Sequence, residues 1–135
     1  MVHTHLTELV FQKTPEFLFA LQGLSRRLLK DREFFSMVQG IHEITLIIPS
    51  KLTPNLLKDL SLFRCLSRIP SLANITLRVP PEYTKTPNIF FALLKPLAAH
   101  HINIIEISST STEIALLVSM DDVQTVVRLL MPEAH

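Results

Sequence analysis

The sequence is poor in glycine. Its 135 residues include only two, Gly23 and Gly40, whereas average usage is about 7%. Phosphate-binding loops of the Gly-x-Gly-x-x-Gly and Walker types need several closely spaced glycines, because the backbone itself must approach the phosphate. Since Gly23 and Gly40 stand far apart, nucleotide binding by such loops is excluded.

Cysteine and an excess of one charge are also missing. A single cysteine, Cys65, forms no internal disulfide and no cysteine zinc cluster, and it predicts a reducing, cytoplasmic location. The 13 basic and 12 acidic residues are spread along the chain and leave a net charge of +1. Because this balance provides no basic surface, neither nucleic acid nor a membrane is expected as a partner.

Long hydrophobic runs are absent, although the chain is 47% hydrophobic with a mean hydropathy of +0.32. Charges and prolines interrupt every stretch before the ~20 residues that a membrane helix requires. The hydrophobic residues must therefore be buried, within the chain or between chains. The length predicts one compact domain or two very small ones.

An internal repeat is visible in the sequence. The segment KTPEFLFAL at residues 13–21 recurs as KTPNIFFAL at residues 85–93. Further on, QGIHEITLIIPS at residues 39–50 matches STSTEIALLVSM at residues 109–120. Because the matched blocks occur in the same order, we interpret the chain as a tandem duplication, with one unit at residues 1–70 and the other at 71–135.

Each copy begins with a predicted strand followed by a helix. Alternating apolar residues indicate the strands, and a hydroxyl residue before a proline marks each helix start. The strands are residues 5–12 and 73–79, and the helices start at Thr14-Pro15 and Thr86-Pro87. In the second copy, Pro96 should kink the helix or end it near Lys95.

Each copy continues with a predicted hairpin and a closing helix. The hairpins pair residues 34–39 with 43–49 and residues 102–108 with 112–118, and the closing helices start at Thr53-Pro54 and at Ser119 with Asp121 and Asp122. Residues 64–72 are a candidate extra strand. The pattern predicts an α+β fold of two tandem ferredoxin-like βαββα units, whose antiparallel sheets are covered by helices on one face.

The other face of each sheet is also partly apolar. Ile47 and Leu117 point away from the apolar residues beside them, because successive strand residues face opposite sides. A sheet that is apolar on both faces needs cover on both. We therefore expect this second face to be buried against another copy, within the chain or in a dimer.

The second half of the chain resembles an ACT domain, a small-molecule-sensing module, and in particular the regulatory ACT pair of aspartate kinases. The resemblance is carried by residues 102–130, INIIEISSTSTEIALLVSMDDVQTVVRLL, and the matching positions are Asn103, Ile104, Ile107, Ser108, Ser111, Glu113 and Ile114. In the first copy, Val38-Gln39-Gly40 and Glu43-Ile44 are similar to the same hairpin. The kinase catalytic part is missing, which implies a protein that is not an enzyme.

The resemblance also implies a ligand site. In that family an effector, often an amino acid, lies between the loop after the first strand and the second strand of a paired unit. The candidate ligand-binding residues here are Thr84, Lys85, Thr86, Asn88, Ile89, Asn103 and Ile104, with Asn103 facing the loop from a partner. The alternative interpretation of this loop is an ordinary helix cap on a solvated turn.

The two copies depart differently from the family's glycine after the loop proline. Asn88 occupies this position in the second copy, and asparagine tolerates left-handed backbone better than most residues. Glu16 occupies it in the first copy, where its carboxylate would repel a ligand carboxylate. The ligand site is therefore expected in the second copy.

No catalytic or metal centre is indicated. His3, His5, His100 and His101 have no acid or cysteine nearby at metal-ligand spacing. The hydroxyl residues 108–112 are typical of a hairpin turn, and no histidine–acid pair is placed to activate them. Acylphosphatase-type chemistry would need an arginine-bearing, glycine-rich loop, which residues 12–15 do not provide. No cofactor is expected.

Two hypotheses remain for the function. The first is a stand-alone regulatory or amino-acid-sensing ACT protein, which is non-catalytic and forms a homodimer. The second is a structural or dimerisation module whose effector site has degenerated, because Glu16 and Asn88 stand where the family has glycine.

Overall fold

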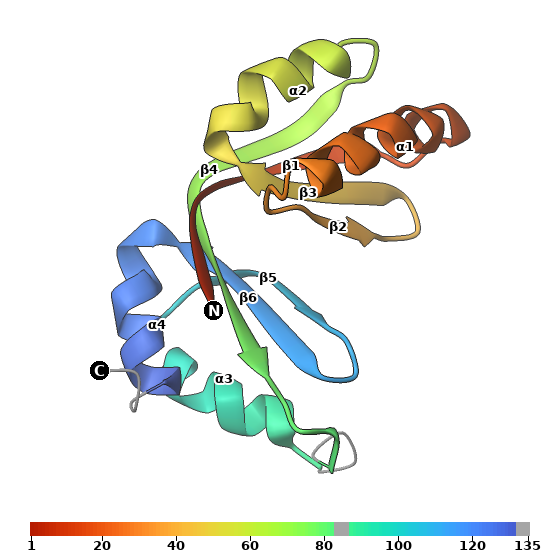
Figure 1. Ribbon diagram of the computed structural model, residues 1–135. Coiled ribbons are helices and arrows are strands. Elements are labelled where there is room, and N and C mark those ends of the chain that lie inside the picture. The colour runs from red at the N-terminus through yellow and green to blue at the C-terminus, as the bar shows by residue number, and fades with distance from the viewer. Residues whose placement is uncertain (83–86, 132–135) are drawn as a thin grey trace. The chain divides into compact units, whose positions relative to one another are not determined.

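The computed structural model describes residues 1–82 and 87–131, and Figure 1 labels their helices and strands. The helices are α1 (Pro15–Lys30), α2 (Thr53–Asp59), α3 (Ile89–Ala99) and α4 (Val123–Leu130), with short 3-10 helices η1 (Ser50–Leu52) and η3 (Met120–Asp122) before α2 and α4. The strands are β1 (Val2–Gln12), β2 (Ser36–Gln39), β3 (Glu43–Pro49), β4 (Cys65–Arg78), β5 (Ile104–Ser109) and β6 (Glu113–Ser119). Among the described helices, none combines the length and the apolar character needed to cross a membrane.

The strands form an antiparallel sheet with the hydrogen-bonded order β2-β3-β1-β4-β6-β5. Contacts divide the chain into two compact units. The first unit is His5–Leu72, and the second unit combines Met1–Thr4 with the residues from Ala73 onward. The mixed helix-and-strand architecture predicted from the sequence is thus confirmed, and the candidate strand at residues 64–72 is the first half of the long strand β4.

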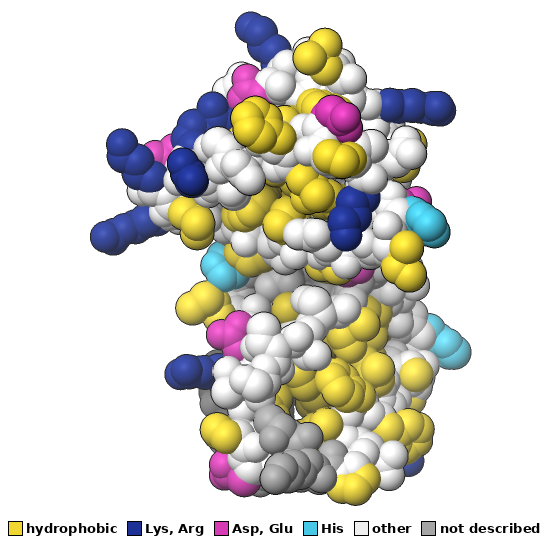
Figure 2. Space-filling model, turned by 90° about the vertical axis from the view of Figure 1, so that its right-hand side faces the viewer, with side chains coloured by type: hydrophobic (Ala, Val, Ile, Leu, Met, Phe, Trp, Pro, Cys, Tyr) yellow, Lys and Arg dark blue, Asp and Glu magenta, His cyan; other side chains and the backbone are white. Residues whose placement is uncertain are grey.

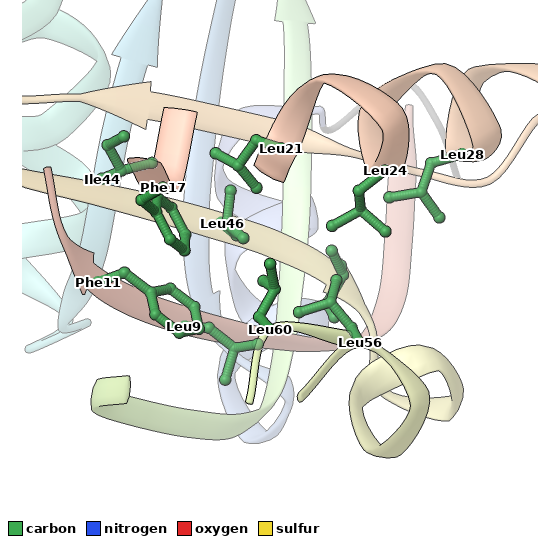
Figure 3. Packing of buried hydrophobic residues seen from close by; sticks show 11 residues of the cluster. Leu9, Phe11, Phe17, Leu21, Leu24, Leu28, Ile44, Leu46, Leu56 and Leu60 are labelled. Carbon is green, nitrogen blue, oxygen red and sulfur yellow. The ribbon is translucent and has the colours of Figure 1, made fainter. Parts of the chain in front are cut away.

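In the first unit, α1 and α2 cover the same face of the strands. The register places Leu9 opposite Leu46 and Phe11 opposite Ile44, and these side chains lie in one core with residues of both helices (Figure 3). The core comprises Leu9, Phe11, Phe17, Leu21, Leu24, Leu28, Ile44, Leu46, Ile48, Leu56 and Leu60. Helices therefore cover one sheet face, as expected.

Helix α1 forms as predicted. Pro15 occupies its first turn, and the Thr14 hydroxyl accepts a hydrogen bond of 3.1 Å from the backbone N–H of Phe17. This bond satisfies one of the N–H groups that a helix start leaves without a partner. The buried residues that follow are spaced by three or four positions and form one apolar stripe toward the sheet; they are Phe17, Leu21, Leu24 and Leu28.

In the second unit, α3 and α4 pack on β4 and β6. The core comprises Ile75, Leu97, Ile114, Leu116, Val118 and Val126. The start of β1 runs along β4: the Met1 amino group donates to Thr76 O at 3.0 Å, and Thr76 N donates to Met1 O at 2.8 Å. The N-terminus therefore supplies a strand to the unit that the C-terminal half builds.

Helix α3 does not end near Lys95, because it continues through Pro96 to Ala99. A proline removes one N–H donor from a helix but leaves its own carbonyl free to accept. The Pro96 carbonyl accepts a hydrogen bond of 3.2 Å from the His100 N–H, and His100 Nδ1 lies 2.9 Å from the same oxygen. The last turn therefore retains the bonds that hold it.

The predicted cap of α2 is also wrong. Thr53 is the first residue of the helix instead of its cap, and Leu52 takes the cap position without a side-chain hydrogen bond. The 3-10 helix η1 runs directly into α2 and already turns the chain before Thr53. Within the described part of the chain, the buried Thr53 hydroxyl has no hydrogen-bond partner.

Candidate functional site

A hollow of about 230 Å³ lies at one end of the second unit. Among the described residues, three pieces of chain border it: the residue after β4, the start of α3 and the turn between β5 and β6. Figure 1 shows where these elements lie. The lining residues are Val79, Ile89, Phe90, Ser109, Thr110, Ser111 and Ile114. Because strand, helix and hairpin turn converge here, this hollow is a candidate site for a small molecule.

Backbone hydrogen bonds fix the walls of the hollow. Val79 N donates to Thr112 O at 2.8 Å, which ties the end of β4 to the hairpin. Thr110 N donates to Glu113 O at 2.9 Å and closes the turn. Ile114 is 4% exposed, and it both lines the hollow and belongs to the hydrophobic core of the unit. These backbone bonds keep the end of β4 and the hairpin turn in place as walls of the hollow.

The start of α3 differs from the prediction. Asn88 has φ 63° and ψ 20°, a left-handed conformation, so the helix begins at Ile89 and not at Thr86-Pro87. A left-handed residue cannot belong to a right-handed helix. The Asn88 carbonyl accepts from Ala92 N at 3.0 Å, whereas the Asn88 side chain does not cap the helix start. The resemblance predicts a glycine at this position, and glycine adopts left-handed backbone readily.

Replacing Asn88 tests how much this left-handed conformation affects stability. We expect Asn88→Ala to lower the free energy of unfolding by about 1 kcal/mol, because left-handed backbone is strained for residues other than Gly, Asn and Asp. Asn88→Gly should leave stability equal to or slightly above that of the unchanged chain. Chemical denaturation measures both variants, and equal stability of the alanine and glycine variants would contradict the assignment.

The residues predicted to bind ligand are only partly brought together. Thr84, Lys85 and Thr86 lie outside the described residues. Asn88 is exposed and immediately precedes Ile89, which lines the hollow.

Asn103 and Ile104 lie at the other end of β5. Asn103 is exposed, while Ile104 opens the strand and packs against the core. The hollow meets this strand at Ser109, and at about 3.3 Å per residue Asn103 is about 20 Å away. Within one unit, therefore, Asn103 does not face the hollow.

Sequence reasoning misses most of the lining. The hydroxyl run indicates a turn, and Ser109, Thr110 and Ser111 are indeed near or in that turn, but they also form a wall of the hollow. Comparison of the two copies provides a usable signal. The matching first-copy residues, Gln39 to Ile41, carry no hydroxyl, so the hydroxyls of the second copy are not needed to form the turn. Val79 and Phe90 give no signal, since each resembles an ordinary core residue.

The same place in the first unit is built differently. Lys13 N donates to His42 O and Gly40 N donates to Glu43 O, both at 2.8 Å, so the backbone pattern matches that of the hollow. Here, however, the Lys13 ammonium donates to Gly40 O at 3.3 Å and lies against the turn. Glu16 is in the first turn of α1, directly after the Thr14 cap and Pro15. The first unit therefore has a capped helix start and a cation at its turn.

Two larger hollows lie elsewhere. One of about 430 Å³ is bordered by α1 and α2, and its rim carries the ion pair between Arg27 and Asp59 at 2.9 Å. The other, of about 490 Å³, is bordered by α4 and the start of β1. Among the residues that the structure describes, no predicted ligand-binding residue lines either of them. In the described ranges, no three His, Cys, Asp or Glu side chains come together as a metal site.

Comparisons with known proteins place the fold. No protein-family model and no curated protein matches this chain. Among solved structures, the regulatory subunit of aspartate kinase from Thermus thermophilus matches with a TM-score of 0.74 and 12% identity, over 98% of this chain and 94% of that one. Aspartate kinase from Clostridium acetobutylicum matches with a TM-score of 0.74 and 17% identity, over 96% of this chain and 32% of that one.

A third match is E. coli aspartokinase III in complex with lysine and aspartate, with a TM-score of 0.70 and 21% identity, over 98% of this chain and 32% of that one. The chain thus spans about a third of the two whole kinases and nearly all of the separate regulatory subunit. The resemblance to the regulatory ACT pair of aspartate kinases is therefore confirmed at the level of the fold.

Proposed function

We propose that this protein is a non-catalytic regulatory protein of the ACT type, which binds an amino acid in the hollow of its second unit. The proposal includes two βαββα units that correspond to residues 1–70 and 71–135, a cytoplasmic location and a homodimer. The fold shared with a separate regulatory subunit supports it. The observation that carries it is the hollow beside the start of α3, where Asn88 precedes the helix in a left-handed conformation and does not cap it with its side chain.

The chemistry of the hollow suits both ends of an amino acid. The Asn88 side chain does not cap the backbone N–H groups at the start of α3, and such groups favour a carboxylate because of their orientation and the helix dipole. Opposite them, Ser109 and Ser111 carry hydroxyls that both donate and accept hydrogen bonds. An amino acid would therefore bridge the helix start and the hairpin turn.

A second copy completes the proposed site. Asn103 is exposed at the far end of β5, where it cannot reach the hollow of its own unit. In a homodimer, the partner's Asn103 would face the bound amino acid, with Ile104 beside it. Binding would then favour one arrangement of the two copies by the difference between the affinities of the two arrangements for the ligand.

Thermal unfolding of the full chain against the amino acids tests the proposal. A ligand present at about 100 times its Kd stabilises a protein by about 2.7 kcal/mol. We expect at least one amino acid to raise the unfolding midpoint of the unchanged chain. Phe90→Ala, which opens a wall of the hollow, should abolish the shift. Phe91→Ala is the matched control, because Phe91 is 64% exposed and does not line the hollow.

A structural or dimerisation module is the second candidate. The first unit favours it, because Lys13 lies against the turn and Glu16 stands at the helix start where the resemblance expects a glycine. If the second unit had also lost its ligand, no amino acid would shift the midpoint while the chain still sedimented as a dimer. That pair of results would overturn the sensing proposal and favour the module.

A further inference from the structure

We infer that the hollow of the second unit selects an amino acid with an uncharged, apolar side chain, such as leucine or phenylalanine, over a cationic one such as lysine. This inference rests on the proposed function, because it specifies the ligand of the same site. It goes beyond the shared fold, since the matching E. coli aspartokinase III structure is a complex with lysine and aspartate, both charged.

The lining of the hollow carries no charged side chain among its described residues. Val79, Ile89, Phe90 and Ile114 are apolar, and the remaining side chains are hydroxyls. A charged group that leaves water needs an opposite charge or a full set of hydrogen bonds. A ligand side chain that ends in an ammonium would find no carboxylate among the described lining residues, whereas an apolar side chain would exchange water for Val79, Phe90 and Ile114.

The size of the hollow agrees with this ligand class. At about 30 Å³ per water molecule, 230 Å³ holds roughly eight waters. This number is close to the count of non-hydrogen atoms in a medium-sized amino acid. Pockets for drug-sized ligands start at about 300 Å³, so the hollow matches an amino acid better in size than a nucleotide or a larger cofactor.

The first unit indicates where the ligand's own ammonium would go. There, the Lys13 ammonium donates to the carbonyl of Gly40 in the hairpin turn. Gly40 and Thr110 are equivalent, because the N–H of each donates to the carbonyl of a glutamate, Glu43 or Glu113. In backbone hydrogen bonding Val79 is likewise equivalent to Lys13, since each donates its N–H to the residue before that glutamate, whereas the sequence repeat aligns Lys13 with Lys85, which lies outside the described residues. By this equivalence, the Thr110 carbonyl accepts a hydrogen bond from the α-ammonium of the ligand.

Hydrophobic side chains reach the surface in both units (Figure 2). In the second unit, Phe90 is 43% exposed at the edge of the hollow and Ile107 is 41% exposed on β5. Phe90 thus has one side toward solvent and one toward the hollow, so a bound apolar side chain would cover part of it. A cationic side chain in the same place would lose water without gaining an opposite charge.

Isothermal titration calorimetry of the full chain with leucine, phenylalanine, threonine, lysine and aspartate tests the inference. We expect leucine or phenylalanine to bind at least tenfold more tightly than lysine or aspartate. Lysine binding as tightly as leucine would overturn the inference and leave the proposed function intact. Binding of none of them, with no thermal shift from any amino acid, would overturn the proposed function itself.

Val79→Lys introduces the first unit's cation into the hollow. The new ammonium should donate a hydrogen bond to the Thr110 carbonyl, and the lysine side chain should fill the hollow. Leucine affinity should therefore fall at least tenfold. Val79→Ile is the matched control and should stay within about threefold of the unchanged chain, because it keeps an apolar wall. Val79 is only partly buried, so the lysine should be accommodated; unchanged leucine affinity in a folded Val79→Lys variant would contradict the inferred site. If that variant fails to fold, the selectivity of the unchanged chain still decides the inference.

Discussion

Phe17→Ala is expected to lower the free energy of unfolding by about 3–5 kcal/mol, the range for truncation of a buried phenylalanine. Phe17 is 0% exposed and its ring is held between two others. The Phe11 ring is stacked at 4.6 Å between centroids, and the Phe63 ring meets it edge-on at 5.1 Å. Figure 3 shows Phe17 between α1 and the strands, so its loss leaves a cavity where helix and sheet meet.

Phe19→Ala is the matched control, because it removes the same ring from the same helix. Phe19 is 76% exposed, and a surface substitution of this kind changes stability by about 0.5 kcal/mol or less. Urea denaturation followed by circular dichroism measures both variants. Equal losses for Phe17→Ala and Phe19→Ala would show that α1 does not pack on the sheet through the stripe described above.

Most helices and strands could be predicted because their signals are local. The Thr14 hydroxyl followed by Pro15 marks a helix start, and the stripe from Phe17 to Leu28 needs no information from elsewhere in the chain. The hairpin strands were predicted within two residues for the same reason, since alternation and a polar turn lie within one short segment.

The long strands could not be predicted in full because their pairing is not local. Met1 pairs with Thr76, and no pattern near either residue announces a partner so far along the chain. The repeat places the boundary between copies at residue 70, whereas contacts assign Met1–Thr4 to the second unit and continue the first unit to Leu72. Because β1 and β4 each contribute residues to both units, no single boundary in the sequence separates the units.

The candidate site was harder to predict than the fold. The sequence pointed to Asn88 and Ile89 through the resemblance, and Ile89 does line the hollow. Val79 and Ser109 meet it only because β4 and the hairpin are bonded together, through contacts such as Val79 N to Thr112 O. A candidate site assembled from segments far apart in the chain has no characteristic residue spacing that could be recognised in the sequence.

Leu117→Asp is expected to lower the free energy of unfolding by more than about 4 kcal/mol, because it places an unpaired carboxylate at a buried position. The sequence predicted that Leu117 and its counterpart Ile47 face away from the helices and need cover. Leu117 is 1% exposed and Ile47 is 3% exposed in the single chain. The cover therefore does not require a second copy, and the variant should unfold or aggregate instead of dissociating.

Ile107→Asp is the control for this prediction, because it adds the same charge to the neighbouring strand β5 at a position that is 41% exposed. We expect a loss of at most about 1 kcal/mol for this variant, since water still reaches the carboxylate. Thermal unfolding and size-exclusion chromatography on both variants measure stability and assembly together. If Leu117→Asp kept the midpoint of the unchanged chain but eluted as a smaller species, Leu117 would lie at an interface between copies, because only a side chain outside the folded core can accept a charge without loss of stability.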